Sequence, residues 1–112
     1  MKTSKKQIKE FCDEFHRVCR ALGLMDWRVD FGMAQLSDRY ATITIDTQSR
    51  TVLLQLADDI DNDCDVRRCA RHEALHLMLA DFRNAAESRT GVDMDAIEHS
   101  VVRRLERFGF EE

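Results

Sequence analysis

The 112-residue sequence predicts a single α+β domain spanning residues 1–112, with the order helix, three strands, helix, helix. Three observations support this fold class. An apolar stripe with helical spacing occupies the first 22 residues, three short strand-like segments follow up to residue 56, and two further helical segments complete the chain. Hydrophobic residues make up 44% of the chain, which is enough to form a core. We expect a small, mainly antiparallel sheet with helices on one face.

The first helix is expected to begin near Ser4 and end near Gly23. Ser4 and Gln7 have the spacing of a capping box, and glycine commonly ends a helix. Apolar residues recur between them at intervals of three and four, which is the periodicity of one helix face. These residues are Ile8, Phe11, Cys12, Phe15, Val18, Cys19 and Leu22. His16 falls outside this stripe, so we expect it at the surface.

Three strands are predicted, at residues 27–33, 40–45 and 51–56. The first alternates between apolar and polar residues, and the other two are rich in β-branched and aliphatic residues. The polar segment 46–50 between the last two has the composition of a turn, so this pair is expected to form an antiparallel hairpin.

The acidic segment 58–63 precedes the second helix. It contains four aspartates but lacks the central glycine and the closing glutamate of a calcium loop, so we interpret it as the helix N-terminal cap. Residues 66–80 contain no glycine or proline and are nearly all apolar after residue 74. They predict a largely buried helix that ends between residues 81 and 87.

This helix carries the sequence His72-Glu73-Ala74-Leu75-His76. Residues four apart lie on the same helix face, so both imidazoles can bind one metal ion. Glu73 lies beside that position, where it can accept a proton from a water molecule that attacks a carbonyl group. The H-E-x-x-H spacing is typical of zinc metallopeptidases. We therefore predict Zn²⁺ bound by His72 and His76, with Glu73 as the catalytic base.

Cysteine ligands are not expected. Cys12 and Cys19 fall on the buried face of the first helix and are interpreted as free thiols. Cys64 and Cys69 lack the C-x-x-C spacing of a structural zinc site. Cys69 shares a helix face with His72, but three ligands along two turns of a straight helix do not converge on a tetrahedral ion.

A catalytic zinc needs a third protein ligand, and the last predicted helix, at residues 93–108, offers Glu98 and His99. Glu98 lies within the apolar stripe of this helix, where a carboxylate is costly unless it binds a partner. His99 lies on the polar side. Glu98 is the preferred ligand; the alternatives are His99 as ligand, and Glu98 as part of a capping box with Asp95.

The pair of histidines with Glu73, followed by Glu98 on another helix, resembles the gluzincin metallopeptidases. The short chain is most similar to the minigluzincins and to related metallopeptidase-like proteins encoded by phages or prophages. The resemblance implies that His72, His76 and Glu98 bind zinc and that Glu73 is the general base. The N-E-x-x-x-D signature of thermolysin-type members is absent, since Ile97 precedes Glu98 and Val102 replaces the aspartate.

The expected activity is hydrolysis of peptide bonds, either latent or narrow in specificity. In this family type an edge strand holds the extended substrate, and residues 40–45 or 51–56 would supply it. Tyr40 and His99 are candidates for stabilising the oxyanion. Two alternatives remain open: a non-catalytic metal-binding phage module, and a three-histidine protease similar to the SprT type with His99 as ligand.

Composition bears on partners and location. The net charge is −4, which disfavours a dedicated nucleic-acid binder. No apolar run is long enough to span a membrane, and the basic N-terminus is not followed by the apolar core of a secretory signal. We therefore expect a cytoplasmic protein that acts on a peptide or protein substrate and is a monomer.

Overall fold

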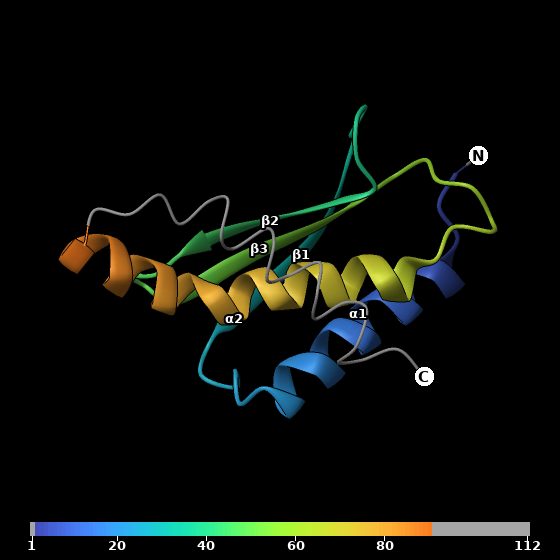
Figure 1. Ribbon diagram of the computed structural model, residues 1–112. Coiled ribbons are helices and arrows are strands. Elements are labelled where there is room, and N and C mark those ends of the chain that lie inside the picture. The colour runs from blue at the N-terminus through green and yellow to red at the C-terminus, as the bar shows by residue number, and fades with distance from the viewer. Residues whose placement is uncertain (1, 91–112) are drawn as a thin grey trace.

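The computed structural model describes residues 2–90, which form two helices and a three-stranded sheet (Figure 1). The elements are α1 (Lys5–Ala21), β1 (Arg28–Ala34), β2 (Ala41–Asp46), β3 (Thr51–Ala57) and α2 (Val66–Thr90). The predicted α+β class is confirmed, and the helix predicted at residues 93–108 lies outside the described residues. Neither helix in the described part of the chain is long and apolar enough to cross a membrane.

The sheet is mixed, with the strand order β1-β3-β2. β2 and β3 form the predicted antiparallel hairpin, whereas β1 runs parallel to β3. The expectation of a mainly antiparallel sheet is therefore wrong. β3 is the most apolar strand and takes the buried central position, so β1 cannot pair with β2, its neighbour in the sequence. The expectation that residues 51–56 could form an edge strand is wrong for the same reason.

One face of the sheet packs against the helices. Val52, Leu54 and Leu56 of β3 are buried on this face, and both helices lie on the same side of the sheet in Figure 1. From α1, Phe11, Phe15 and Val18 complete the core. Leu53 points to the opposite face and is 40% exposed. The predicted arrangement, with helices on one face of the sheet, is confirmed.

Both edge strands point alternate backbone groups away from β3. The N–H of Arg28 donates to the carbonyl of Arg50, and the carbonyl of Ala34 accepts from Asp58. Even-numbered residues of β1 therefore face β3, and because backbone groups alternate along a strand, Val29, Phe31 and Met33 direct their N–H and C=O groups outward. In β2 the Tyr40 carbonyl accepts from Ala57, so Ala41, Ile43 and Ile45 face outward in the same way.

Local interactions fix the start of α1 as predicted. Ser4 is the N-cap, and its side chain and that of Gln7 form a reciprocal capping box. The Gln7 side chain also donates to the carbonyl of Asp61 at 2.7 Å, which ties α1 to the segment before α2. Gly23 follows the helix with φ of +74°, a conformation that glycine adopts without strain.

The start of α2 differs from the prediction in its capping residue. Asp65 accepts a hydrogen bond from the backbone N–H of Arg68, three residues into the helix, so Asp65 is the cap rather than a residue of segment 58–63. The segment fails as a cap because two residues, Cys64 and Asp65, separate it from Val66, the first helical residue. α2 also continues to Thr90, beyond the predicted end.

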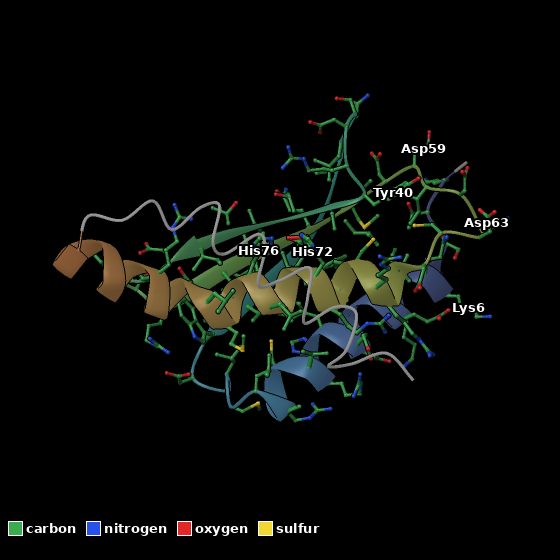
Figure 2. The ribbon with its side chains drawn as sticks, viewed as in Figure 1. Lys6, Tyr40, Asp59, Asp63, His72 and His76 are labelled. Atoms are coloured by element: carbon green, nitrogen blue, oxygen red, sulfur yellow. The ribbon has the colours of Figure 1, made fainter. Side chains whose placement is uncertain are left out.

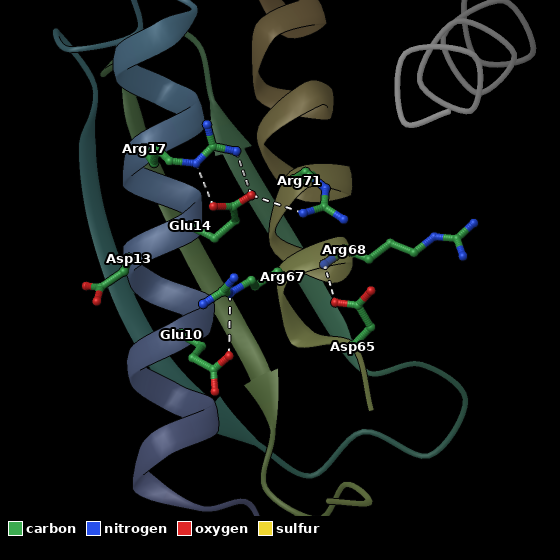
Figure 3. A pocket seen from close by; sticks show the side chains of 8 residues that line it. All are labelled: Glu10, Asp13, Glu14, Arg17, Asp65, Arg67, Arg68 and Arg71. Atoms are coloured by element: carbon green, nitrogen blue, oxygen red, sulfur yellow. Dashed lines mark hydrogen bonds and ion pairs between the residues drawn. The ribbon is translucent and has the colours of Figure 1, made fainter. Parts of the chain in front are cut away.

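A charged cluster joins α1 to α2 (Figure 3). Glu14 of α1 accepts two hydrogen bonds from Arg17, at 2.7 and 2.8 Å, and one from Arg71 of α2, at 3.1 Å. The Glu14 side chain is 10% exposed and the Arg71 side chain 12%. The Arg17 hydrogen bond, followed by that of Arg71, lowers the pKa of Glu14 below its ordinary value of 4.5. This ion pair positions the helix turn that immediately precedes His72.

We predict that Glu14→Gln lowers the free energy of unfolding at pH 7 by about 1.5–3 kcal/mol, because Arg71 loses a buried charged acceptor. The folded pKa of Glu14 is depressed, so its stabilisation is complete above pH 4.5 and is lost as pH falls through the folded pKa. Denaturant unfolding between pH 2.5 and 7 should therefore show a weaker pH dependence in the variant. Asp13→Asn, at an exposed ion pair with Lys9, is the matched control and should cost less than about 1 kcal/mol. Equal losses in the two variants would contradict the role assigned to Glu14.

Candidate metal centre

His72 and His76 bring two ring nitrogens together on one face of α2. Their Nε2 atoms are 3.0 Å apart and their ring centroids 4.7 Å apart, with an angle of 67° between the ring planes. Both side chains are half-buried, on the side of α2 that Figure 2 shows toward the sheet. The helical spacing predicted from the sequence thus produces two convergent imidazoles.

The convergence of these nitrogens fits a zinc ion. In a tetrahedral site with Zn–N bonds of about 2.0–2.1 Å, two ligand nitrogens lie about 3.3–3.4 Å apart. The observed 3.0 Å is a few tenths of an ångström shorter, which small side-chain rotations can accommodate. Imidazole nitrogen is also among the preferred ligand types of zinc. His72 and His76 are therefore able to hold the predicted ion.

Glu73 is buried beside the two histidines. The residue is only 8% exposed, and a carboxylate that is buried to this extent requires polar or charged partners. The Glu73 charge raises the pKa of Arg39, which lies in the loop before β2, although the neighbouring Asp38 has the larger effect. α2, which carries Glu73, packs against β2.

Arg39 was not anticipated by the sequence analysis. It sits in the polar loop before β2, and its guanidinium binds the carboxylate of Asp38 through two hydrogen bonds of 3.2 and 3.3 Å. No periodicity or motif in this loop distinguishes Arg39, because its relation to Glu73 depends on the packing of α2 against β2. Tyr40, the adjacent residue, has an exposed side chain, and its proposed role at the oxyanion stays a prediction.

The third ligand predicted for zinc, Glu98 or His99, lies outside the described residues. Within residues 2–90, no third histidine, cysteine or acidic side chain joins His72 and His76 to complete a metal-binding group. Cys69, one turn before His72, hydrogen-bonds to Cys64, and its burial raises its pKa to about 12.

Comparison with family models, curated proteins and solved structures found no match to this chain.

We predict that the protein binds Zn²⁺ and that His72→Ala or His76→Ala weakens the binding at least about 100-fold, because either change removes one of two convergent ligands. Isothermal titration with Zn²⁺ measures the affinity, and elemental analysis measures the metal content. His16→Ala is the matched control, since His16 is an exposed histidine on α1. Absence of bound zinc in the unchanged protein at saturating Zn²⁺ would exclude the metal centre.

Separate substitutions of Glu98 and His99 identify the third ligand. We expect Glu98→Ala to reduce zinc affinity by about 10- to 100-fold and His99→Ala to leave it unchanged, since the apolar stripe places Glu98 on the buried face of its predicted helix. The same titration serves both variants. The reverse result would assign His99 and favour the three-histidine site.

Proposed function

We propose that the protein is a zinc-dependent peptidase of the gluzincin type. The observation that supports this most strongly is the distance of 3.0 Å between the Nε2 atoms of His72 and His76. Glu73, which follows His72 in the sequence, is buried. Two convergent imidazoles alone would suit any zinc site. A carboxylate held next to them adds a proton acceptor, which a purely structural site does not need.

The chemistry divides between the ion and the chain. Zinc, when bound, polarises the carbonyl of the scissile peptide and makes a water molecule more acidic. His72 and His76 hold the ion and fix its position relative to α2. Glu73 accepts a proton from the attacking water and returns it to the nitrogen of the leaving amine. The burial of Glu73 keeps bulk water from competing for its carboxylate, which favours this proton transfer.

The edge of β2 is the proposed substrate site. α2 packs against β2, and Ala41, Ile43 and Ile45 direct their backbone N–H and C=O groups away from β3. An extended peptide can add to this edge as a fourth strand and bind these groups through main-chain hydrogen bonds. Main-chain binding does not depend on side-chain identity. Specificity would therefore come from residues next to the strand, such as the exposed Tyr40 and Arg39.

We predict that Glu73→Gln abolishes peptide hydrolysis while zinc binding is retained, because glutamine keeps the shape of the side chain but accepts no proton. The loss in kcat should be at least about 100- to 10,000-fold. Cleavage of a quenched fluorescent peptide library, with zinc content measured in parallel, tests this. Glu10→Gln is the matched control, since Glu10 lies on α1 and pairs with Arg67 at 3.4 Å.

Three outcomes are informative. Cleavage by the unchanged protein, retained in Glu10→Gln and lost in Glu73→Gln, supports the proposal. Equal cleavage by both variants removes Glu73 from the mechanism. Zinc binding without cleavage of any peptide by the unchanged protein favours a non-catalytic metal-binding module.

A further inference from the structure

Two thiols meet at the start of α2. Asp65 caps this helix, so Cys64 occupies the position before the cap and Cys69 the fourth helical position. Side chains at these two positions commonly contact one another and fix the entry of the chain into a helix. Here the thiol of Cys69 donates a hydrogen bond to the sulfur of Cys64, and both side chains pack against the buried core.

The backbone around both cysteines holds them in this contact. The N–H of Cys64 donates to the carbonyl of Asp61 at 3.1 Å, which closes a turn before the helix. The same carbonyl accepts a hydrogen bond of 2.7 Å from the side chain of Gln7, so this turn is anchored to α1. The N–H of Cys69 donates to the carbonyl of Asp65 at 3.3 Å, which places Cys69 in the first turns of α2. The fold itself therefore brings the two sulfur atoms together.

The other two cysteines of the chain are arranged differently. Cys12 and Cys19 both lie on α1, and their separation of seven residues corresponds to about 10 Å along the helix axis. A disulfide requires Cα atoms that are within about 7 Å of each other. Cys12 and Cys19 cannot be joined while α1 is intact, whereas Cys64 and Cys69 are already in contact.

We propose that Cys64 and Cys69 form a redox site, which a small-molecule disulfide such as oxidised glutathione converts into an intramolecular disulfide at the start of α2. The contact needs only two apolar side chains, but two thiols in the same positions can also be joined covalently. In a reducing compartment the thiols stay free, and the bond forms when conditions become oxidising. The free thiols of the structure are then the reduced state of this site.

The environments of the two thiols decide which one reacts first. Burial raises the pKa of Cys69 to about 12, and the charge of Cys64 and the hydrogen bond to it act in the same direction. Burial also raises the pKa of Cys64, but the hydrogen bond that it accepts from Cys69 counteracts this rise. Because the thiolate is the nucleophile, Cys64 is the attacking thiol and Cys69 the second one to react.

The reaction proceeds in two exchange steps. The thiolate of Cys64 attacks one sulfur of oxidised glutathione, the bond between the two glutathione sulfurs breaks, and one glutathione leaves with the proton that Cys64 has lost. Cys69 then loses its proton and attacks the Cys64 sulfur of this mixed disulfide, which releases the second glutathione as a thiol. Two protein thiols are oxidised, and one small disulfide is reduced to two thiols.

The disulfide does not depend on the proposed function. Neither thiol is among the proposed zinc ligands, so thiol oxidation and zinc binding are separate measurements. Oxidation is carried out in the presence of a chelator, which keeps metal ions away from the thiols.

Mass spectrometry of the folded protein after incubation with oxidised glutathione tests the proposal. The unchanged protein should lose two hydrogen atoms and yield a peptide in which Cys64 is linked to Cys69, while Cys12 and Cys19 still react with an alkylating reagent. Dithiothreitol should restore all four thiols. Cys69→Ser should retain one glutathione on Cys64, because the second thiol is missing. Cys12→Ser is the matched control, since Cys12 is a half-buried cysteine on α1 and its loss should leave the disulfide unchanged.

Thermal unfolding provides a second measurement on the same samples. The oxidised protein should unfold at least about 4 °C above the reduced protein, because closing the ring of residues 64–69 removes conformations from the unfolded chain. A melting temperature that does not rise overturns the proposal, since the bond would then not restrain the start of α2.

The products of oxidation provide further grounds for rejection. Absence of the Cys64–Cys69 disulfide in the unchanged protein overturns the proposal, as does glutathione that stays attached to Cys64 when Cys69 is present. Pairing of either thiol with Cys12 or Cys19 also overturns it, because the folded chain would then not select the partner.

Discussion

The candidate site depends on one constraint: the position and rotation of α2 about its axis. Two histidines four residues apart share one helix face, and the rotation of the helix decides whether that face points into the core or toward its border. The rotation of α2 is fixed by its buried residues, among them Ala70, Ala74 and Leu77, which pack into the core. With these residues inside, His72 and His76 are left half-buried at the border of the core, and their Nε2 atoms meet at 3.0 Å.

Interactions around the first turns hold α2 in this position. Asp65 caps its N-terminus, and Arg71 reaches across to the buried carboxylate of Glu14 on α1. Arg71 immediately precedes His72, so the ion pair restrains the backbone next to this histidine. A buried ion pair contributes little net stability compared with apolar packing, but it permits few alternative geometries. Here the ion pair orients α2 relative to α1. A metal site built on two histidines requires an orientation that is accurate to a fraction of an ångström.

Sequence patterns predicted the features of this fold that depend on neighbours in the chain. The capping box of Ser4 and Gln7, the β2–β3 hairpin and the helical position of His72 and His76 all follow from local spacing, and the structure has all three. The parallel pairing of β1 with β3 was not predictable in this way, because competition for the central position is decided by the burial of all three strands together. The effect of Glu73 on the pKa of Arg39 was not predictable for a similar reason, because it depends on the packing of α2 against β2.

The strand order gives the two edges of the sheet different surroundings. Because β3 occupies the centre, β2 and β1 each present one row of backbone groups outward, but only β2 has α2 packed against it. α2 packs against β2, and the apolar side chains Ala41, Ile43 and Ile45 of β2 are more deeply buried than Phe31 and Met33 of β1. At β1 the helices leave Phe31 and Met33 partly exposed. The central position of β3 thus gives the two edges of the sheet different coverage by the helices.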